Sequence, residues 1–159
     1  MTTFEEKFKN EEFLLYLLPS VARKMSRTCE SVYAAEFGLK IAEWRLLAQI
    51  SRFGQISAKE ISDRISMDQV SISRAAHSCT TKGLIGEIPD PDDRRSKKFT
   101  LTEAGETFME RFLPRACSLA EAMEGGLSET EIRTLKSLLT KLDSHLQTLE
   151  FGKPGEAAA

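Results

Sequence analysis

Apolar residues near the start of the chain recur at three- and four-residue steps, the spacing of one apolar stripe along a helix. The stripe comprises Leu14, Leu17, Leu18, Val21, Met25 and Val32. It predicts a helix that runs to about Phe37 and ends at Gly38. Pro19 lies inside the stripe, so a start near residue 20 is an alternative.

A second apolar pattern predicts a helix over about 42–53, which Gly54 ends. Its inward positions are Trp44, Leu47, Ala48 and Ile50. Ser57 and Glu60 then form a capping box that opens a short helix ending near Ile65. Asp68 is suited to cap another helix over 69–82, before Gly83. Two short helices joined by residues 66–68 resemble a helix-turn-helix.

Beyond Gly83 the period of the apolar pattern changes from that of a helix to that of a strand. Leu84, Ile85 and Ile88 come before a turn, and Phe99 and Leu101 alternate with polar residues after it. The pattern predicts a two-stranded hairpin whose projecting tip is 89–93, where Asp90 and Pro91 suit a turn. A hairpin that follows a helix-turn-helix makes a winged helix, so the predicted fold class is mainly α with a small β-hairpin wing.

Two long helices complete the pattern. Thr102 caps one that runs to about Glu124, and Ser128 with Glu131 caps the last one after the break at Gly125. The stripe of the last helix comprises Ile132, Leu135, Leu138, Leu139, Leu142, Leu146 and Leu149. Such a stripe commonly packs inside a monomer. Because a compact winged helix has no room for three long apolar helices, we instead expect a second copy as partner, with an interface that includes Leu14, Leu17, Leu135, Leu138, Leu139, Leu142 and Leu146.

The expected organisation is one integrated domain. A dimerisation helix over 1–37 precedes the winged helix over 38–101, and dimerisation helices over 102–151 precede a disordered tail over 152–159. The run 13–22 is too short to span a bilayer, and the acidic residues before it argue against a signal peptide. We therefore expect a cytoplasmic protein without a membrane partner.

The charge balance excludes a function that depends on bulk positive charge. Lys and Arg total 22 against 24 for Asp and Glu, so the net charge is −2, and a nucleic-acid role needs locally placed cations. The cysteines, Cys29, Cys79 and Cys117, lack the spacing of a disulfide framework or a zinc site. We expect no cofactor and no metal. The chain also lacks the common catalytic and nucleotide-binding motifs, so an enzyme is not expected.

The helix over 69–82 carries the candidate DNA-reading surface. A helical wheel places Ile72, Ala75, Ala76 and Cys79 on one face and Val70, Arg74, His77 and Thr81 on the opposite face. No acidic residue lies in this range, as expected where phosphate docks. Hydroxyls suit phosphate, Arg or Gln suits base edges, and Val suits a thymine methyl. The candidates are Ser57, Gln69, Val70, Ser71, Ser73, Arg74 and His77. The alternative is an ordinary amphipathic helix with a solvated polar face.

Three segments together resemble the MarR family of winged-helix transcription regulators. They are Lys82-Gly83-Leu84-Ile85, the acidic and arginine-rich 90–95, and Phe99-Thr100-Leu101-Thr102-Glu103-Ala104-Gly105. The resemblance implies a homodimer that sets two winged helices against successive major grooves of double-stranded DNA. It also implies that Arg95 is a wing arginine held by Asp93, and that Arg94, Lys97 and Lys98 face the minor groove or the backbone. The chain departs from the family at Gly86 and Glu87, where an arginine is usual.

The resemblance further implies a small effector, often an aromatic carboxylate or a phenol, that releases a repressor from a pseudo-palindromic operator. Arg23 and Arg27 are candidates to pair with its carboxylate, and Trp44 to line its pocket. Each also has an ordinary interpretation, as a surface charge or a core tryptophan. Two other functions stay open: a redox-sensing regulator, for which Cys29 is the best cysteine, and a winged-helix module that binds protein instead of DNA.

Overall fold

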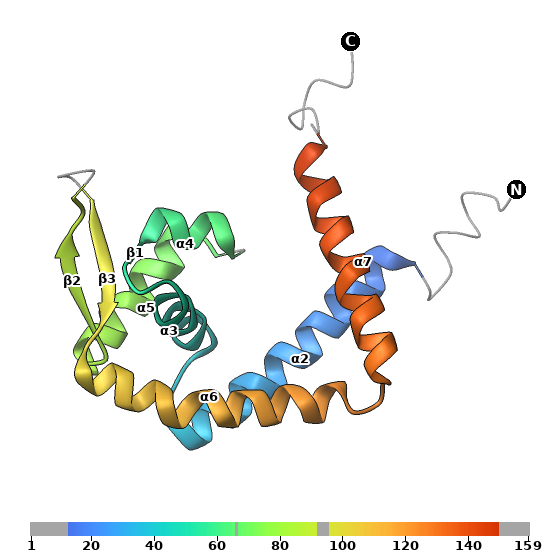
Figure 1. Ribbon diagram of the computed structural model, residues 1–159, viewed down its shortest axis with the longest axis horizontal. Coiled ribbons are helices and arrows are strands. Elements are labelled where there is room, and N and C mark those ends of the chain that lie inside the picture. Colours follow the sequence, from blue (N-terminus) through green and yellow to red (C-terminus); the bar gives the residue numbers. More distant parts are fainter. Residues whose placement is uncertain (1–12, 66, 92–95, 150–159) are drawn as a thin grey trace, which may run out of the picture. The chain divides into compact units, whose positions relative to one another are not determined.

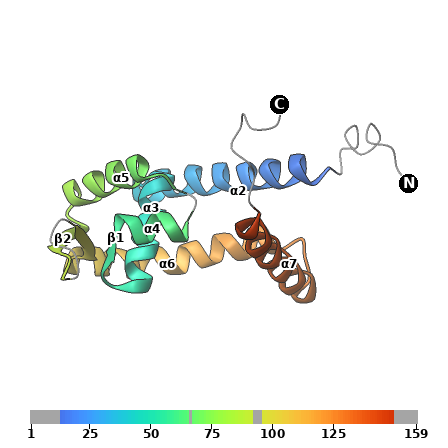
Figure 2. The same ribbon diagram turned by 90° about the horizontal axis from the view of Figure 1, so that it is seen from above.

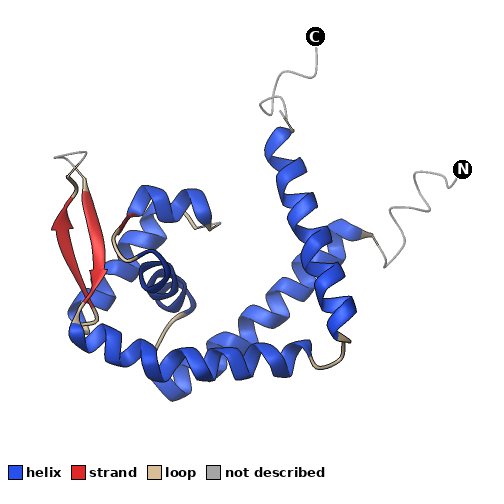
Figure 3. Ribbon diagram, in the orientation of Figure 1, coloured by secondary structure: helices blue, strands red, loops and turns tan. Residues whose placement is uncertain are grey.

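The computed structural model describes residues 13–65, 67–91 and 96–149 of the chain (Figure 1). The chain forms two compact units, one up to Leu119 and the other from Ala120 onward. Helices dominate, and the strands form one small antiparallel sheet (Figure 3). The predicted fold class, mainly helical with a β-hairpin wing, is confirmed.

The first two helices are α2, Leu14–Phe37, and α3, Ile41–Phe53. Helix α2 ends as predicted at Gly38, whose φ of 62° is a left-handed conformation that suits glycine. Pro19 lies inside α2, so the alternative start near residue 20 is wrong. The helix tolerates this proline six residues into its length, where it forfeits one backbone hydrogen bond.

The helix-turn-helix consists of α4, Ala58–Arg64, and α5, Gln69–Thr81. The predicted capping box is present: the Ser57 backbone N–H donates to Glu60 Oε2 at 2.8 Å, and the Glu60 N–H donates to Ser57 Oγ at 3.2 Å. Asp68 caps α5 by accepting a hydrogen bond of 2.8 Å from the Ser71 N–H. Both helix starts are therefore fixed by local side chains, as the sequence predicts.

The sheet contains β1, Ile56–Ser57, β2, Ile85–Pro89, and β3, Lys97–Leu101, in the order β1-β3-β2. The hairpin of β2 and β3 confirms the predicted wing. Two details of the prediction are corrected. Pro89 belongs to β2, in register with Lys97, and not to the tip of the hairpin. In addition, β1 pairs Ile56 with Phe99, so a third strand joins the wing to the start of α4.

The core of the winged helix lies between α3, α5 and the sheet. Its fully buried side chains include Leu39, Leu46, Leu47, Ile50, Ile56, Ile61 and Ile72. The inward face of α3 is thus centred on Leu46, Leu47 and Ile50, whereas Trp44 and Ala48 are only half-buried. The expectation that both of these residues face the core was wrong in part, because the buried face of α3 follows Glu43, Leu46, Leu47 and Ile50 and leaves Trp44 and Ala48 at its edge. Seen from above, α5 lies at one edge of the winged helix and the first half of α6 at the other (Figure 2).

Helix α6, Glu103–Glu124, follows the wing directly. Thr102 caps it by accepting a hydrogen bond of 3.0 Å from the Gly105 N–H, and its own hydroxyl donates to the Gly83 carbonyl at 2.6 Å. A Cβ at Gly105 would collide with the carbonyl of Leu84, so only glycine allows this approach. Gly105 therefore serves the packing of α6, and neither it nor Pro114 interrupts the helix.

The last helix, α7, covers Glu129–Thr148 and starts at the predicted capping box of Ser128 and Glu131. None of its residues is buried. Its apolar stripe stays open, with Leu135, Leu138, Leu139 and Leu146 between 42% and 57% exposed. The expected tail over 152–159 lies outside the described residues. Among the helices that are described, none combines the length and apolar character needed to cross a membrane.

Candidate nucleic-acid interface

The two faces of α5 separate as the wheel predicts. Ile72, Ala75, Ala76 and Cys79 are all buried, at 4% exposure or less. On the opposite face, Val70 is 58% exposed, although it is apolar. The other exposed candidates on this helix are Gln69, Ser73, Arg74 and His77. The predicted reading surface is therefore accessible to a partner.

The Asp68 carboxylate and the Ser71 hydroxyl at the start of α5 are hydrogen-bonded to each other. The Ser71 hydroxyl donates to Asp68 Oδ2 at 2.7 Å, and the Ser71 N–H donates to Oδ1. The hydrogen bonds from the Ser71 side chain and backbone lower the pKa of Asp68, which therefore stays ionised. Ser71 thus has a capping role, and its contact with DNA stays a prediction.

Ser57 differs from the other candidates because it is only 6% exposed. Its hydroxyl donates to Glu60 Oε2 at 2.8 Å, within the capping box of α4. The structure therefore gives Ser57 a local structural role. A phosphate contact by this residue is not supported by its burial, and it stays a prediction.

The wing cations that the structure describes are paired with acidic residues of the same hairpin. Lys97 Nζ lies 2.6 Å from Glu87 Oε2, and Lys98 Nζ lies 3.5 Å from Asp90 Oδ1. The Lys97 side chain is 68% exposed, but that of Lys98 is only 17% exposed. Lys97 is therefore much better placed than Lys98 to meet a partner. The remaining wing predictions, Asp93, Arg94 and Arg95, lie outside the described residues.

A pocket of about 270 Å³ separates the outward face of α5 from the wing. Its lining includes Ser73 and His77 of α5 and Glu87 of β2. The sequence marked Glu87 only as a departure from the family pattern. The structure adds that this carboxylate lies beside two of the predicted DNA contacts and forms an ion pair with Lys97.

An ion pair that the sequence did not predict joins the C-terminal end of α5 to α3. Lys82, the C-cap of α5, places Nζ 2.6 Å from Glu43 Oε2 at the start of α3. The Glu43 side chain is 3% exposed. Burial alone would raise the pKa of Glu43, but hydrogen bonds from Lys82, Ser78 and the Lys40 backbone lower it. Glu43 lies on the inward side of an amphipathic helix, and that position was the one available signal.

The candidate effector residues do not share one pocket. Arg23 and Arg27 are exposed on α2. The ring of Trp44 packs edge-on against Tyr33, with centroids 5.5 Å apart, and its Nε1 is buried without a hydrogen-bond partner in the described structure. A pocket of about 350 Å³ beside it is lined by Trp44, Arg45, Ala48, Gln49 and Ile65. Arg45 and Gln49, which the sequence analysis did not select, are therefore the polar groups next to Trp44.

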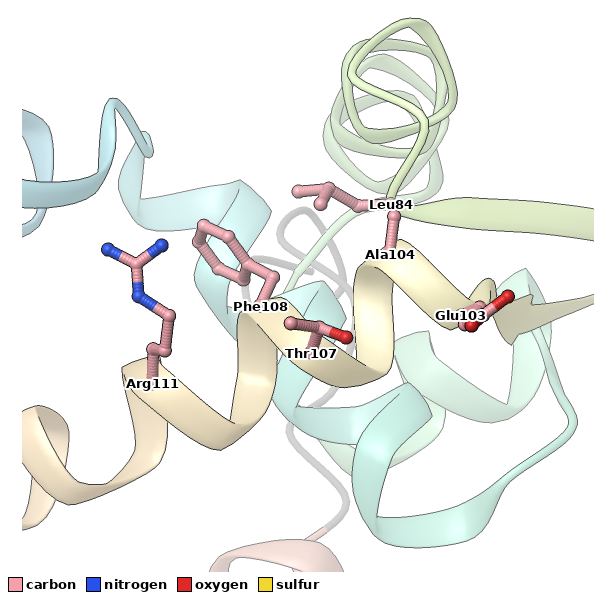
Figure 4. Close-up of a pocket in the computed structure, with 6 residues that line it drawn as sticks. All are labelled: Leu84, Glu103, Ala104, Thr107, Phe108 and Arg111. Atoms are coloured by element: carbon pink, nitrogen blue, oxygen red, sulfur yellow. The ribbon is translucent and has the colours of Figure 1, made fainter.

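A third pocket, of about 460 Å³, lies along the first turns of α6 (Figure 4). Leu84 and Phe108 supply its apolar wall, and Glu103 and Arg111 lie at its opposite ends. None of the sequence-predicted site residues lines it. This pocket adds to the open apolar surface of the long helices.

The cysteines lie in different environments. Cys29 and Cys79 are buried, and Cys117 is exposed. Burial and the nearby Glu43 raise the pKa of Cys79 to about 12, so its thiol stays protonated at neutral pH. A protonated, buried thiol is a poor nucleophile, which weighs against Cys79 as the sensor of a redox mechanism.

A helix-turn-helix and a wing together define the winged-helix fold, and the exposed, acid-free face of α5 suits contact with DNA. Residues 37–96, which include α3 to β2, match the model of the MarR family. This segment is therefore similar to the MarR family of transcriptional regulators, in agreement with the resemblance of the sequence motifs.

Similar proteins extend the match to most of the chain. The HTH-type transcriptional repressor IacR of Pseudomonas putida is 26% identical over 144 residues, which cover 91% of this chain and 86% of that protein. The fold is similar to that of a mutant MarR from E. coli in complex with operator DNA, with a TM-score of 0.74, 22% identity, and coverage of 89% of this chain and 99% of that one. It is also similar to the fold of BpsR from Bordetella bronchiseptica, with a TM-score of 0.75, 22% identity, and coverage of 90% of this chain and 97% of that one. The binding of BpsR to DNA is regulated by 6-hydroxynicotinic acid.

Proposed function

We propose that the protein is a ligand-responsive transcriptional repressor that binds a pseudo-palindromic operator as a homodimer. The observation that carries the proposal is the outward face of α5, on which Gln69, Arg74 and His77 are exposed while the opposite face is buried. The similarity to a repressor and to a fold solved on operator DNA supports the same function.

The two α5 helices of the dimer enter successive major grooves, with half-site centres about 10 base pairs apart. Arg74 and Gln69 read base edges, because a guanidinium or an amide forms paired hydrogen bonds with them. Ser73 and the exposed Lys97 contact phosphates, and Arg94 and Arg95 enter the minor groove beside them. Because few cations take part, affinity depends on geometry and on salt concentration.

The test uses a DNA duplex that the wild-type protein selects from a library with a randomised core of about 20 base pairs, long enough for two half-sites. Arg74→Ala is expected to weaken binding about tenfold and to relax specificity at one position of each half-site. Arg111→Ala, which removes an exposed guanidinium on α6, is the matched control. Failure of the wild-type protein to select any duplex would favour the protein-binding module.

The open apolar stripes of α2 and α7 support the homodimer. Leu14 and Leu17 on α2 are 50% and 43% exposed, and four leucines of α7 are similarly open. Contiguous apolar surface of this kind is rare on a stable monomer. Light scattering should give twice the chain mass of 17.8 kDa, and a monomer at micromolar concentration would contradict the proposal.

The buried Nε1 of Trp44 supports a small acidic aromatic effector in the pocket beside it. An N–H without a partner is costly to bury, and a carboxylate or phenol oxygen would satisfy it. Arg45 and Gln49 line the same pocket and suit an anion. Binding releases DNA if the effector prefers one spacing of the two α5 helices.

Trp44→Phe removes the N–H but keeps an aromatic ring. With 6-hydroxynicotinic acid and benzoic acid as probes, the wild-type protein should show a rise in melting temperature that Trp44→Phe reduces. Gln49→Ala should also reduce the rise, because it removes another neutral hydrogen-bond donor from the same pocket. An equal rise in all three proteins would exclude this pocket.

A further inference from the structure

The ammonium group of Lys82 connects the ends of three helices. Lys82 Nζ lies 2.6 Å from Glu43 Oε2 and donates a second hydrogen bond, of 2.8 Å, to the carbonyl of Gly38. Gly38 is the C-cap of α2, Glu43 lies in the first turn of α3, and Lys82 is the C-cap of α5. The contact therefore joins α5 to the junction through which α2 continues into α3.

The carboxylate at the centre of this contact is held from several directions. The Lys40 N–H donates to the same Glu43 oxygen at 2.8 Å. Ser78, one turn before Lys82 on α5, adds a hydrogen bond from its side chain. A charged group with directional bonds tolerates little displacement, because a shifted partner leaves a buried charge without compensation.

The apolar face of α5 defines the position of this helix much less strictly. Its buried side chains are Ile72, Ala75, Ala76 and Cys79, and all but one of them are small. Small side chains interlock weakly, so apolar packing alone leaves room for α5 to slide or turn. The contact of Lys82 with Glu43 and Gly38 supplies the missing constraint at one end of the helix.

We propose that the Glu43–Lys82 ion pair is the positioning device of the DNA-reading helix. It fixes α5 along its axis and about it, so that Gln69 and Arg74 meet the bases in register. The two residues act through α5 and do not touch DNA. The proposal rests on the proposed function for its role in DNA binding, but the position of α5 can be measured without DNA.

The main test replaces the pair by apolar residues of similar size, in the double variant Glu43→Leu with Lys82→Met. The Glu43 side chain is buried and that of Lys82 is 35% exposed. Apolar replacement of a pair with a buried charge is often tolerated, so the double variant should fold with a melting temperature close to that of the wild type. Its affinity for the selected duplex should nevertheless fall about tenfold, since α5 no longer has a fixed position. Binding with wild-type affinity would overturn the proposal.

Two further variants separate positioning from general stability. Lys82→Arg keeps the charge and a donor and should retain affinity within about threefold of wild type, whereas a loss as large as that of the double variant would contradict the proposal. Glu36→Gln with Arg115→Gln is the matched control. It removes an ion pair of 2.7 Å between α2 and α6 that does not contact α5, and it should bind the duplex fully.

Amide hydrogen exchange of the free protein gives the readout that does not need DNA. In the double variant the amides of α5 should exchange faster than in the wild-type protein, while those of α4 keep their protection. Equal protection of α5 in both proteins would overturn the proposal. If the wild-type protein selects no duplex, the proposed function fails, and the exchange experiment still decides whether the pair fixes α5.

Discussion

Helices α5 and α7 carry apolar stripes of similar regularity, but the two stripes differ in burial. Ile72, Ala75, Ala76 and Cys79, the inward residues of α5, are exposed by 4% or less, whereas no residue of α7 is buried. The periodicity of a sequence reports which face of a helix is apolar. It does not report what covers that face, because the cover comes from elsewhere in the chain or from another molecule.

The largest expected effect tests this contrast directly. Ile72→Ala on α5 removes a side chain that is 0% exposed, so it should lower the free energy of unfolding by about 3 kcal/mol through lost burial and a cavity. Leu138→Ala on α7 starts from 57% exposure and should cost less than about 1 kcal/mol in dilute protein. Urea denaturation of both variants provides the measurement, and similar losses would remove the contrast.

The next effect concerns the contact of α6 with the winged helix. Gly105→Ala should destabilise the protein by about 2 kcal/mol, because the added Cβ overlaps the Leu84 carbonyl and the backbone must shift. Gly126→Ala is the control outside the winged helix, since a Cβ there has nothing within 4 Å. Comparison of the two melting temperatures should show a drop for Gly105→Ala alone.

A third prediction concerns the pH dependence of the stability that Glu43 contributes at the end of α5. Glu43→Gln should cost about 1.5 kcal/mol at neutral pH, the scale of a hydrogen bond to a charged group. The pKa of Glu43 is lowered in the folded protein, so its contribution is present above the ordinary carboxyl pKa and is lost as pH falls through the folded pKa. The difference between wild type and variant should therefore shrink on acidification. A difference that is constant from neutral to acidic pH would contradict an ionised Glu43.

The smallest effect compares two capping boxes of the same type. Ser57→Ala should cost about 1 kcal/mol, because its hydroxyl caps α4 inside the winged helix. Ser128→Ala should cost less, since the Glu131 N–H donates to Ser128 Oγ over a longer distance of 3.4 Å and α7 has no buried face. Thermal unfolding followed by circular dichroism provides the measurement. A larger loss for Ser128→Ala than for Ser57→Ala would contradict the prediction.

Local signals predicted most of the elements of the fold. The capping residues Ser57, Asp68 and Ser128 fixed three helix starts, and the change of period after Gly83 fixed the wing. These signals act over a few residues, so the sequence alone contains them. The predicted faces of α5 are equally local, because they follow from the geometry of one helix.

Features that join distant residues could not be predicted in this way. Lys82 and Glu43 are 39 positions apart, and nothing near either residue indicates the other. The two-residue strand β1 is too short for a recognisable alternation, and its partner Phe99 lies far along the chain. The unpaired Nε1 of Trp44 likewise depends on which residues of the folded chain surround it.

Strand β1 has a consequence for the proposed recognition of a duplex. Ile56 and Ser57 pair with β3 and lead directly into α4, so backbone hydrogen bonds tie the hairpin to the helix-turn-helix. In the proposed complex with DNA, α5 and the wing would therefore contact the duplex at a fixed interval. Sequence changes that twist or stretch the DNA between these two points should therefore be sensed even where no side chain touches a base.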